Sequence, residues 1–408
     1  MDARQVAETA ARVSYGRLLA YLSARSRDVA AAEDALGDAL RAALESWPRD
    51  GVPEKPEGWL ITTARRKLID NNRRKQARSS AMETLWLITD EIEPDADLFP
   101  DERLKLLFVC SHPAIDPMAR TPLMLQTVLG FDAGRIASAF LVAPATMGQR
   151  LVRAKAKIRD ANIAFEVPEK SELSGRLEAV LEAIYAVYGT AWEHVAPVDS
   201  HNSQLVDEAL WLAHLVVELL PDEPEAKGLL ALLLHCEARR AARRLEDGSF
   251  VPLSEQNPDK WSRPMMIEAE QMLAAAVALK RMGRFQLEAA IQSAHAERMR
   301  GGCVEWSAIV QLYKGLIAVA PSIGALLGRA AAVAAFGAPQ DALVLIEEIP
   351  ATSVEAHQPY WALRGHVLQR LGKTREAKAA YERAIGLTED AAVRDFLIRR
   401  TLCFEPDP

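Results

Sequence analysis

Cysteines are scarce in this 408-residue chain, and no two of the four form a CxxC pair. That spacing argues against a disulfide framework or a zinc knuckle and predicts reduced thiols. No run approaches 18 uncharged apolar residues, and arginines interrupt the N-terminal stretch, so we expect neither a signal peptide nor a membrane span. Together these absences predict a cytoplasmic protein. The cysteines are Cys110, Cys236, Cys303 and Cys403.

Signals for catalysis or metal binding are equally few. The chain has no glycine-rich phosphate loop and no Gly-x-Ser-x-Gly elbow. His194 and His201, with Glu193 and Asp199 beside them, are too loosely spaced for a typical metal site. We therefore expect no enzyme, no metal and no cofactor.

Aromatic residues make up only 6% of the chain, whereas alanine and leucine dominate, which favours an all-α fold. The length of 408 residues predicts two to four domains. The formal net charge of -7 excludes a uniformly basic DNA-coating protein. The charge is segregated instead. Residues 65–78 hold seven Lys/Arg and one acid, residues 150–159 hold five Lys/Arg and no acid, and residues 83–102 hold eight acids and no base.

Four sections follow from these patterns. Residues 1–80 are predicted to be helical, with one break at 48–56 where three prolines and a glycine interrupt a helix. Residues 81–100 form an acidic connector, and residues 101–165 form a compact helical module. Residues 166–408 begin with a Pro168-containing break and are predicted to be helical after it.

The first section holds an acidic amphipathic helix over 31–47. Its inward face is predicted to carry Leu36, Leu40 and Leu44. The acidic outward face either binds a protein partner or is only exposed to solvent. Its outward residues are Glu33, Asp34, Asp38, Arg41 and Glu45.

A basic helix is predicted over 57–75, after the loop. Trp59, Leu60, Ala64 and Leu68 would pack, although Trp59 can also stack on a base; the core role is the commoner one for such a tryptophan. A basic helix behind an open loop suits single-stranded or distorted DNA. The outward residues are Arg65, Arg66, Lys67, Asn71, Asn72, Arg73, Arg74 and Lys75.

The third section contains two short helices joined by a turn. Asp132 is a good N-cap for helix 133–140, and Pro144 is a favoured first residue for the next helix. In that second helix Met147, Leu151, Ala154 and Ile158 form a buried stripe. A polar face opposite such a stripe is typical of a major-groove recognition helix, and a solvated face is the alternative. The polar face consists of Thr146, Gln149, Arg150, Arg153 and Lys157.

Residues 361–384 have the spacing of a 34-residue tetratricopeptide helix–turn–helix repeat, with Gly372 at the turn. The repeat positions are Trp361, Gly365, Leu368, Ala377, Tyr381 and Ala384. A weaker copy lies around Ala330, Val333, Gly337 and Ala342.

Residues 5–165 resemble a bacterial sigma factor of the extracytoplasmic-function (ECF) class, which keeps only regions 2 and 4. The resemblance rests on the runs 32–39 and 58–65 with its basic tail, and on residues 130–159. It implies that Glu33, Asp34, Asp38 and Arg41 bind core RNA polymerase. It also implies that the helix from Trp59 to Arg74 reads and opens the -10 element, with loop 48–56 holding a flipped base. Residues 130–159 would read the -35 element as duplex.

The remaining chain is similar to an ECF subgroup with a long tetratricopeptide-like extension, often encoded beside small DGPF-type proteins. The resemblance implies that this extension regulates activity without a separate anti-sigma protein, and we expect it to contact the sigma regions or polymerase. The acidic connector would either mimic RNA in the polymerase or act as a spacer. The alternatives to a sigma factor are a tetratricopeptide interaction scaffold and a helix-turn-helix regulator of another kind.

Overall fold

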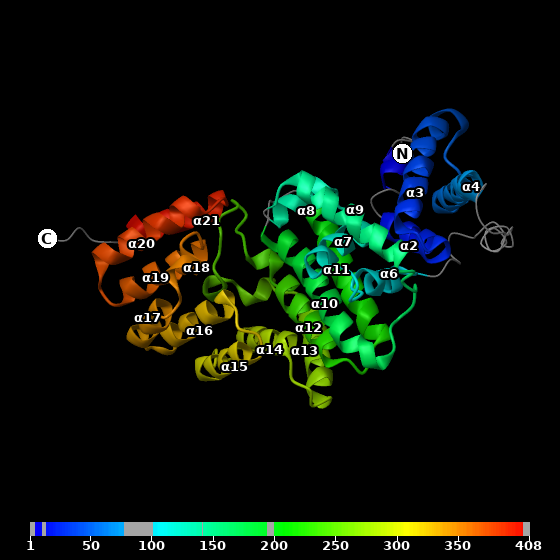
Figure 1. Ribbon diagram of the computed structural model, residues 1–408. Coiled ribbons are helices and arrows are strands. Elements are labelled where there is room, and N and C mark those ends of the chain that lie inside the picture. The colour runs from blue at the N-terminus through cyan, green and yellow to red at the C-terminus, as the bar shows by residue number, and fades with distance from the viewer. Residues whose placement is uncertain (1–4, 10–13, 77–100, 141, 194–199, 403–408) are drawn as a thin grey trace. The chain divides into compact units, whose positions relative to one another are not determined.

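The structure, a computed structural model, describes residues 5–9, 14–76, 101–140, 142–193 and 200–402 (Figure 1). These residues form helices joined by turns and one isolated β-bridge, Arg244–Phe250, with no strand among them. The all-α prediction is confirmed. The chain divides into two compact units, Met1–Thr190 and Ala191–Pro408. The acidic connector, residues 81–100, lies outside the described residues.

Unit 1 contains two groups of helices. The first bundle comprises α2 (Tyr15–Ser26), α3 (Val29–Asp50) and α4 (Pro56–Gln76). The second bundle comprises α6 (Arg103–Cys110), α7 (Pro117–Leu129), α8 (Ala133–Ala139) and α9 (Pro144–Asp160). Helix α10 (Lys170–Glu193) follows the second bundle along the chain.

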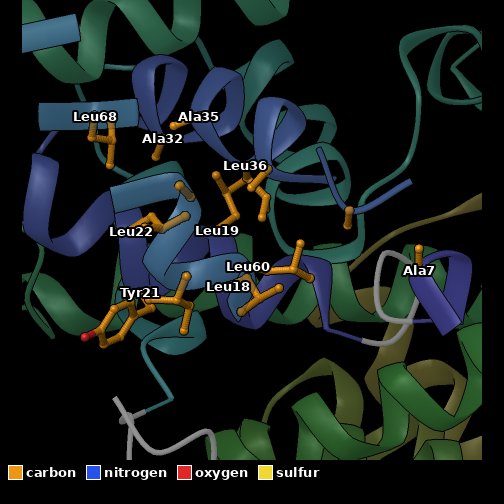
Figure 2. Packing of buried hydrophobic residues seen from close by; sticks show 14 of the residues in the cluster. Ala7, Leu18, Leu19, Tyr21, Leu22, Ala32, Ala35, Leu36, Leu60 and Leu68 are labelled. Atoms are coloured by element: carbon orange, nitrogen blue, oxygen red, sulfur yellow. The ribbon is translucent and has the colours of Figure 1, made fainter. Parts of the chain in front are cut away.

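The first bundle has its own apolar core, built from one face of each helix (Figure 2). Asp28 caps α3 by accepting a hydrogen bond from the Ala31 amide at 3.0 Å. The buried face of α3 steps by three or four residues through Leu36, Ala39 and Ala43 to Trp47. Burying these side chains against α2 and α4 supplies the main stabilisation of the bundle.

Two sequence expectations about α3 were wrong. Leu44 is 45% exposed rather than buried. Four residues turn an α-helix by about 40° more than one full turn. The two steps from Leu36 to Leu44 therefore carry the side chain away from the buried face of the helix. The helix also continues through Pro48 to Asp50. A proline near the C-terminal end removes only one backbone hydrogen bond, and the helix stops at Gly51, whose φ of 88° favours glycine.

Within unit 1 the two bundles touch. Helix α2 packs against α6 and α7, and α3 contacts α9. Gly130, with a φ of 69°, ends α7, and Asp132 then caps α8 by accepting from the Arg135 amide at 2.9 Å. The predicted N-cap and the predicted start of α9 at Pro144 are both confirmed.

Unit 2 is a succession of packed helices. Its first half comprises α11 (Ser200–Leu219), α12 (Pro224–Glu237), α13 (Arg263–Ala278) and α14 (Arg284–Ala296), with short 3-10 helices at Arg240–Ala242, Leu253–Glu255, Pro258–Lys260 and Glu297–Arg300. Its second half comprises α15 (Trp306–Val319), α16 (Ile323–Phe336), α17 (Pro339–Glu347), α18 (Ala351–Val354), α19 (Gln358–Arg370), α20 (Thr374–Leu387) and α21 (Ala391–Leu402).

Helical hairpins occupy both places where the sequence suggested repeats. Helices α19 and α20 pack closely around a turn at Gly372, whose φ is 73°. Helices α16 and α17 pack in the same way around Gly337, whose φ is 106°. A Cβ on Gly365 would lie 3.0 Å from the Tyr381 ring, so a small residue is needed at this crossing. Membership of the tetratricopeptide class itself stays a prediction.

The segment after α12 also packs on the last helix of unit 2. Arg244 forms an ion pair with Asp390, and Glu255 forms one with Arg400 of α21. Phe250 meets Phe396 edge to face, with ring centroids 5.5 Å apart. These contacts, here called the clasp, join segments about 145 residues apart in sequence and tie α21 to the first half of unit 2.

Candidate nucleic-acid interface

The solvent face of α3 carries most of the acidic residues that the sequence placed there. Asp34 is exposed, and Asp38 pairs with the exposed Arg41 at 2.5 Å. An exposed ion pair within one helix contributes little stability, so it can break when a binding partner offers these two side chains other contacts. This face is therefore open for a protein contact.

Glu33 does not share that orientation, and the expectation that it points outward was wrong. Its side chain is 25% exposed and forms an ion pair with Lys155 of α9. The Tyr15 hydroxyl donates a second hydrogen bond to the same carboxylate at 3.3 Å. Burial, followed by the charge of Glu33, raises the pKa of Tyr15 above its usual value, so the tyrosine stays a donor. Glu33 thus lies in the contact between the two bundles.

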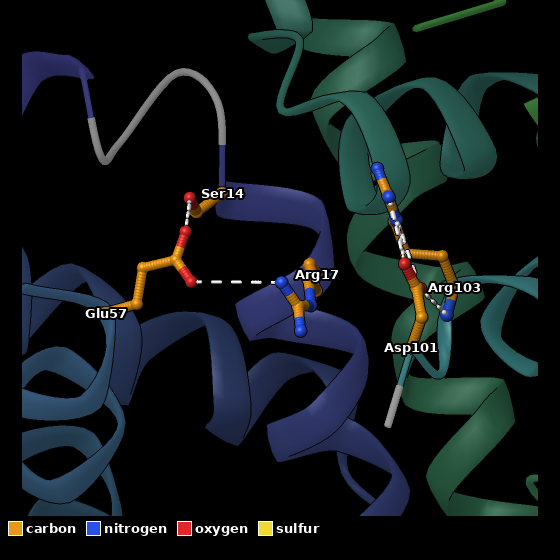
Figure 3. A network of polar contacts seen from close by, with 5 residues as sticks. All are labelled: Ser14, Arg17, Glu57, Asp101 and Arg103. Carbon is orange, nitrogen blue, oxygen red and sulfur yellow. Dashed lines mark hydrogen bonds and ion pairs between the residues drawn. The ribbon is translucent and has the colours of Figure 1, made fainter. Parts of the chain in front are cut away.

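The N-terminus of α4 is fixed to α2 through Glu57. Ser14 donates a hydrogen bond to this carboxylate, and Arg17 lies 4.0 Å from it (Figure 3). A carboxylate in the first turn also interacts favourably with the helix dipole. At the start of α6 a local pair, Arg103 with Asp101 at 2.9 Å, orders the chain where it enters the second bundle (Figure 3).

Helix α4 buries one face and exposes basic residues on another. Leu60, Ala64 and Leu68 are buried as predicted, and Ile61, which the sequence pattern missed, is buried as well. Arg66 and Lys67 are exposed, whereas Arg65 is half-buried. The side chains of Asn71, Asn72, Arg73, Arg74 and Lys75 lie outside the described residues.

Trp59 is half-buried rather than fully exposed. Its ring meets that of Trp47 edge to face, with centroids 5.5 Å apart and planes at 69°. The side chain therefore contributes to the core of the first bundle and keeps part of its surface in solvent. That position is compatible with either role weighed for it, packing or stacking on a base.

Helix α9 has the two faces that its sequence predicts. Met147, Leu151, Ala154 and Ile158 are at most 5% exposed. On the opposite side Thr146, Gln149, Arg153 and Lys157 are exposed and Arg150 is half-buried. The Pro144 end carries the unpaired backbone amides that favour a phosphate. This surface of the helix is free to approach an anionic partner.

Lys155 is the residue of α9 that the sequence reasoning overlooked. Its side chain is 9% exposed and directed at α3, where it pairs with Glu33. The signal was present, because position 155 is four residues after Leu151 and so continues the buried stripe. The lysine lies close to Cys110, a buried thiol whose pKa burial raises to about 12, so this cysteine is not a reactive nucleophile.

No cluster of three His, Cys, Asp or Glu side chains with metal-ligand geometry occurs among the residues that the structure describes. His194 lies outside those residues, and nothing is described of the His201 side chain. No helix in the described part of the chain is long and apolar enough to cross a membrane.

Comparison with known proteins identifies the first bundle. Residues 12–78, which contain α2, α3 and α4, match sigma-70 region 2. This module belongs to transcription factors rather than enzymes and indicates a sigma-factor-like role in transcription initiation, with core RNA polymerase and promoter DNA as its partners. Residues 176–277 match a family of unknown function (DUF6596).

The whole chain has a full-length relative. It is 37% identical over 385 residues to the uncharacterized protein R00370 of Rhizobium meliloti (strain 1021), covering 92% of this chain and 90% of that protein. The chain therefore belongs to the same family as that protein. No solved structure matches it.

Proposed function

We propose that this protein is an ECF-type sigma factor that binds core RNA polymerase and directs promoter-specific initiation by recognising -10 and -35 DNA. The observation that carries the proposal is the polar face of α9, opposite a buried stripe, in the same compact unit as the sigma-70 region 2 match. Catalysis would belong to the polymerase, in the bacterial cytoplasm.

Helix α9 would act as the recognition helix of a helix-turn-helix with α8. Gln149, Arg150 and Arg153 have the side chains that make bidentate contacts to base edges in the major groove. Thr146 near the helix N-terminus and Lys157 farther along would contact phosphates, which position the helix without reading sequence.

The first bundle would bind polymerase and the -10 element. The open face of α3, with Asp34, Asp38 and Arg41, would dock on polymerase. Trp59, Arg65, Arg66, Asn71, Arg73 and Arg74 of α4 would contact the opened -10 strand. The solvent-facing part of Trp59 offers a stacking surface of the kind that single-strand binders use.

Residues 166–408 would regulate activity by contacting the sigma regions. In support, Arg176 of α10 donates a hydrogen bond to the Phe108 carbonyl of α6 and is only 6% exposed. The helical hairpins of unit 2 suit a protein-binding role, so an interaction scaffold remains the second candidate function.

The test is sequence-specific promoter binding by the full-length protein with core RNA polymerase. Arg153→Ala should cost about 1–3 kcal/mol on the cognate promoter and much less on a promoter with a scrambled -35 element. The control is Arg159→Ala, at the far end of α9, where the side chain pairs with Asp160 at 2.9 Å. Arg159 would contact a phosphate rather than a base, so this variant should weaken binding to both promoters about equally. Equal losses on both promoters for Arg153→Ala would contradict the assignment of α9.

A further inference from the structure

We propose that unit 2 contains a binding site for a small oxyanion, the carboxylate or phosphate group of a small molecule, held by Arg239 and Arg298 around the ring of Trp261. The site lies where the chain after α12, the segment 253–261 and the end of α14 meet. These elements are separate from the helices assigned to polymerase and promoter DNA. The proposal therefore goes beyond the proposed function and does not depend on it.

The first element of the site is Arg239, a buried cation just after α12. Its side chain is 7% exposed. The Nε atom donates to the His235 carbonyl at 3.1 Å, and Nη2 donates to the Gln292 side-chain oxygen at 2.6 Å. Glu270 of the neighbouring α13 instead accepts from the Ser293 hydroxyl at 2.6 Å. In the described part of the chain Arg239 meets only uncharged partners, so its buried positive charge is not compensated.

The second element is Arg298, in the 3-10 helix after α14. Its two terminal nitrogens donate to the backbone carbonyls of Leu253 at 2.5 Å and of Gln256 at 2.9 Å. No carboxylate among the described residues pairs with it. The guanidinium carbons of Arg239 and Arg298 lie 6.0 Å and 5.7 Å from the centre of the Trp261 ring. An aromatic face attracts a cation but leaves its charge in place, so two positive charges share one small region.

The electrostatics of His295, near the end of α14, report the same imbalance. The half-buried imidazole meets the Trp306 ring edge to face, with centroids 5.4 Å apart. Burial, followed by the charges of Arg239 and Arg298, lowers the pKa of His295 to about 4. Both of these charges are positive, so the local potential is positive. At neutral pH the uncharged imidazole is a further hydrogen-bonding group beside the two arginines.

Trp261 adds a buried hydrogen-bond donor to this region. Its side chain is 3% exposed, and its Nε1 has no acceptor among the described residues. A buried donor without an acceptor costs free energy. An oxyanion supplies acceptors and negative charge together, and a guanidinium pairs with a carboxylate or phosphate through two parallel hydrogen bonds. Because Arg239 and Trp261 are almost wholly covered by unit 2, the surface of a folded partner cannot reach them and the occupant is a small molecule.

The experiment measures binding to the full-length protein by isothermal titration calorimetry at constant ionic strength. The probes are inorganic phosphate and, separately, citrate. Arg298→Gln removes one of the two charges of the site. The matched control is Arg375→Gln, which removes the same charge from an exposed position of α20. Thermal unfolding checks that each variant is folded, and hydrogen exchange of the wild type with and without each probe locates the binding site.

At least one probe should bind saturably to this region of the wild type, and the tighter probe identifies the group as phosphate or carboxylate. Arg298→Gln should weaken that binding by about 10- to 100-fold, as expected for hydrogen bonds to a charged group. Arg375→Gln should weaken it by less than about twofold, because a distant exposed charge is screened. Addition of the probe should slow hydrogen exchange in peptides covering residues 239–243 and 292–300.

Several results would overturn the site. One is the absence of saturable binding for both probes, and another is exchange protection confined to unit 1, where the basic helices α4 and α9 also attract anions. Equal weakening by Arg298→Gln and Arg375→Gln would reveal only a general attraction of anions. If Arg298→Gln does not fold, the exchange pattern of the wild type decides. None of these results bears on polymerase binding, so the sigma-factor function is tested separately.

Discussion

Replacing Gly16 by alanine places a methyl group where α2 and α7 touch, 1.8 Å from the Val128 carbonyl oxygen and 2.7 Å from its carbon. The obstacle is backbone, which cannot rotate away like a side chain, so the upper end of the usual overpacking range applies, about 3 kcal/mol. Alanine also returns about 1 kcal/mol of helix propensity in α2. The expected net loss in the stability of this contact is about 2 kcal/mol.

Hydrogen exchange measured by mass spectrometry suits this prediction, because it reports local opening in a protein of two units. A loss of about 2 kcal/mol corresponds to roughly 30-fold faster exchange in peptides covering α2 and α7. Gly37→Ala is the matched control, since a Cβ on Gly37 of α3 meets nothing within 4 Å. That variant should exchange no faster than the wild type. Unchanged protection in Gly16→Ala, or an equal effect in Gly37→Ala, would refute the packing argument.

Three further predictions concern unit 2. Burial lowers the pKa of His295 to about 4. Because the unfolded histidine takes up a proton near pH 6.5, this group should remove about 3 kcal/mol of stability as the pH falls from about 6.5 to 4. His295→Gln should flatten that part of the urea-midpoint profile, and an unchanged profile would contradict the assignment. A Cβ on Gly228 would lie 2.6 Å from the Gln286 backbone nitrogen, so Gly228→Ala should lower the free energy of unfolding by about 1–3 kcal/mol, measured by thermal unfolding. A melting temperature equal to that of the wild type would contradict the close packing of α12 on α14. Phe396→Ala removes the ring that meets Phe250, so amide exchange in residues 244–256 should accelerate, and unaltered exchange there would show that the clasp does not hold this segment.

Local patterns were sufficient to predict much of unit 1. The N-cap Asp132, the start of α9 at Pro144 and the stripe from Met147 to Ile158 all depend on residues within one or two helical turns. The same holds for the packing face of α4. Such signals are read from spacing alone, because a helix brings residues three and four apart onto one side.

The errors came from contacts between distant segments. Glu33 was expected in solvent because nothing near it in sequence shows that Lys155 lies opposite, and an acid on an amphipathic helix is usually exposed. The requirement for glycine at position 16 is also invisible locally, since it arises from the Val128 backbone of another helix. The clasp in unit 2 was missed for the same reason, because its ion pair joins Arg244 to Asp390, a residue far away in the sequence.

The most direct test of the central claim is run-off transcription with purified bacterial core RNA polymerase and the full-length protein, on a set of genomic promoter fragments. We expect the protein to elute with core polymerase on a sizing column and to initiate transcripts from discrete start sites, and we expect Arg153→Ala to reduce these transcripts in line with its cost of about 1–3 kcal/mol in promoter binding. Failure of the full-length protein to bind polymerase or to start any transcript would contradict the sigma-factor function and favour the interaction scaffold.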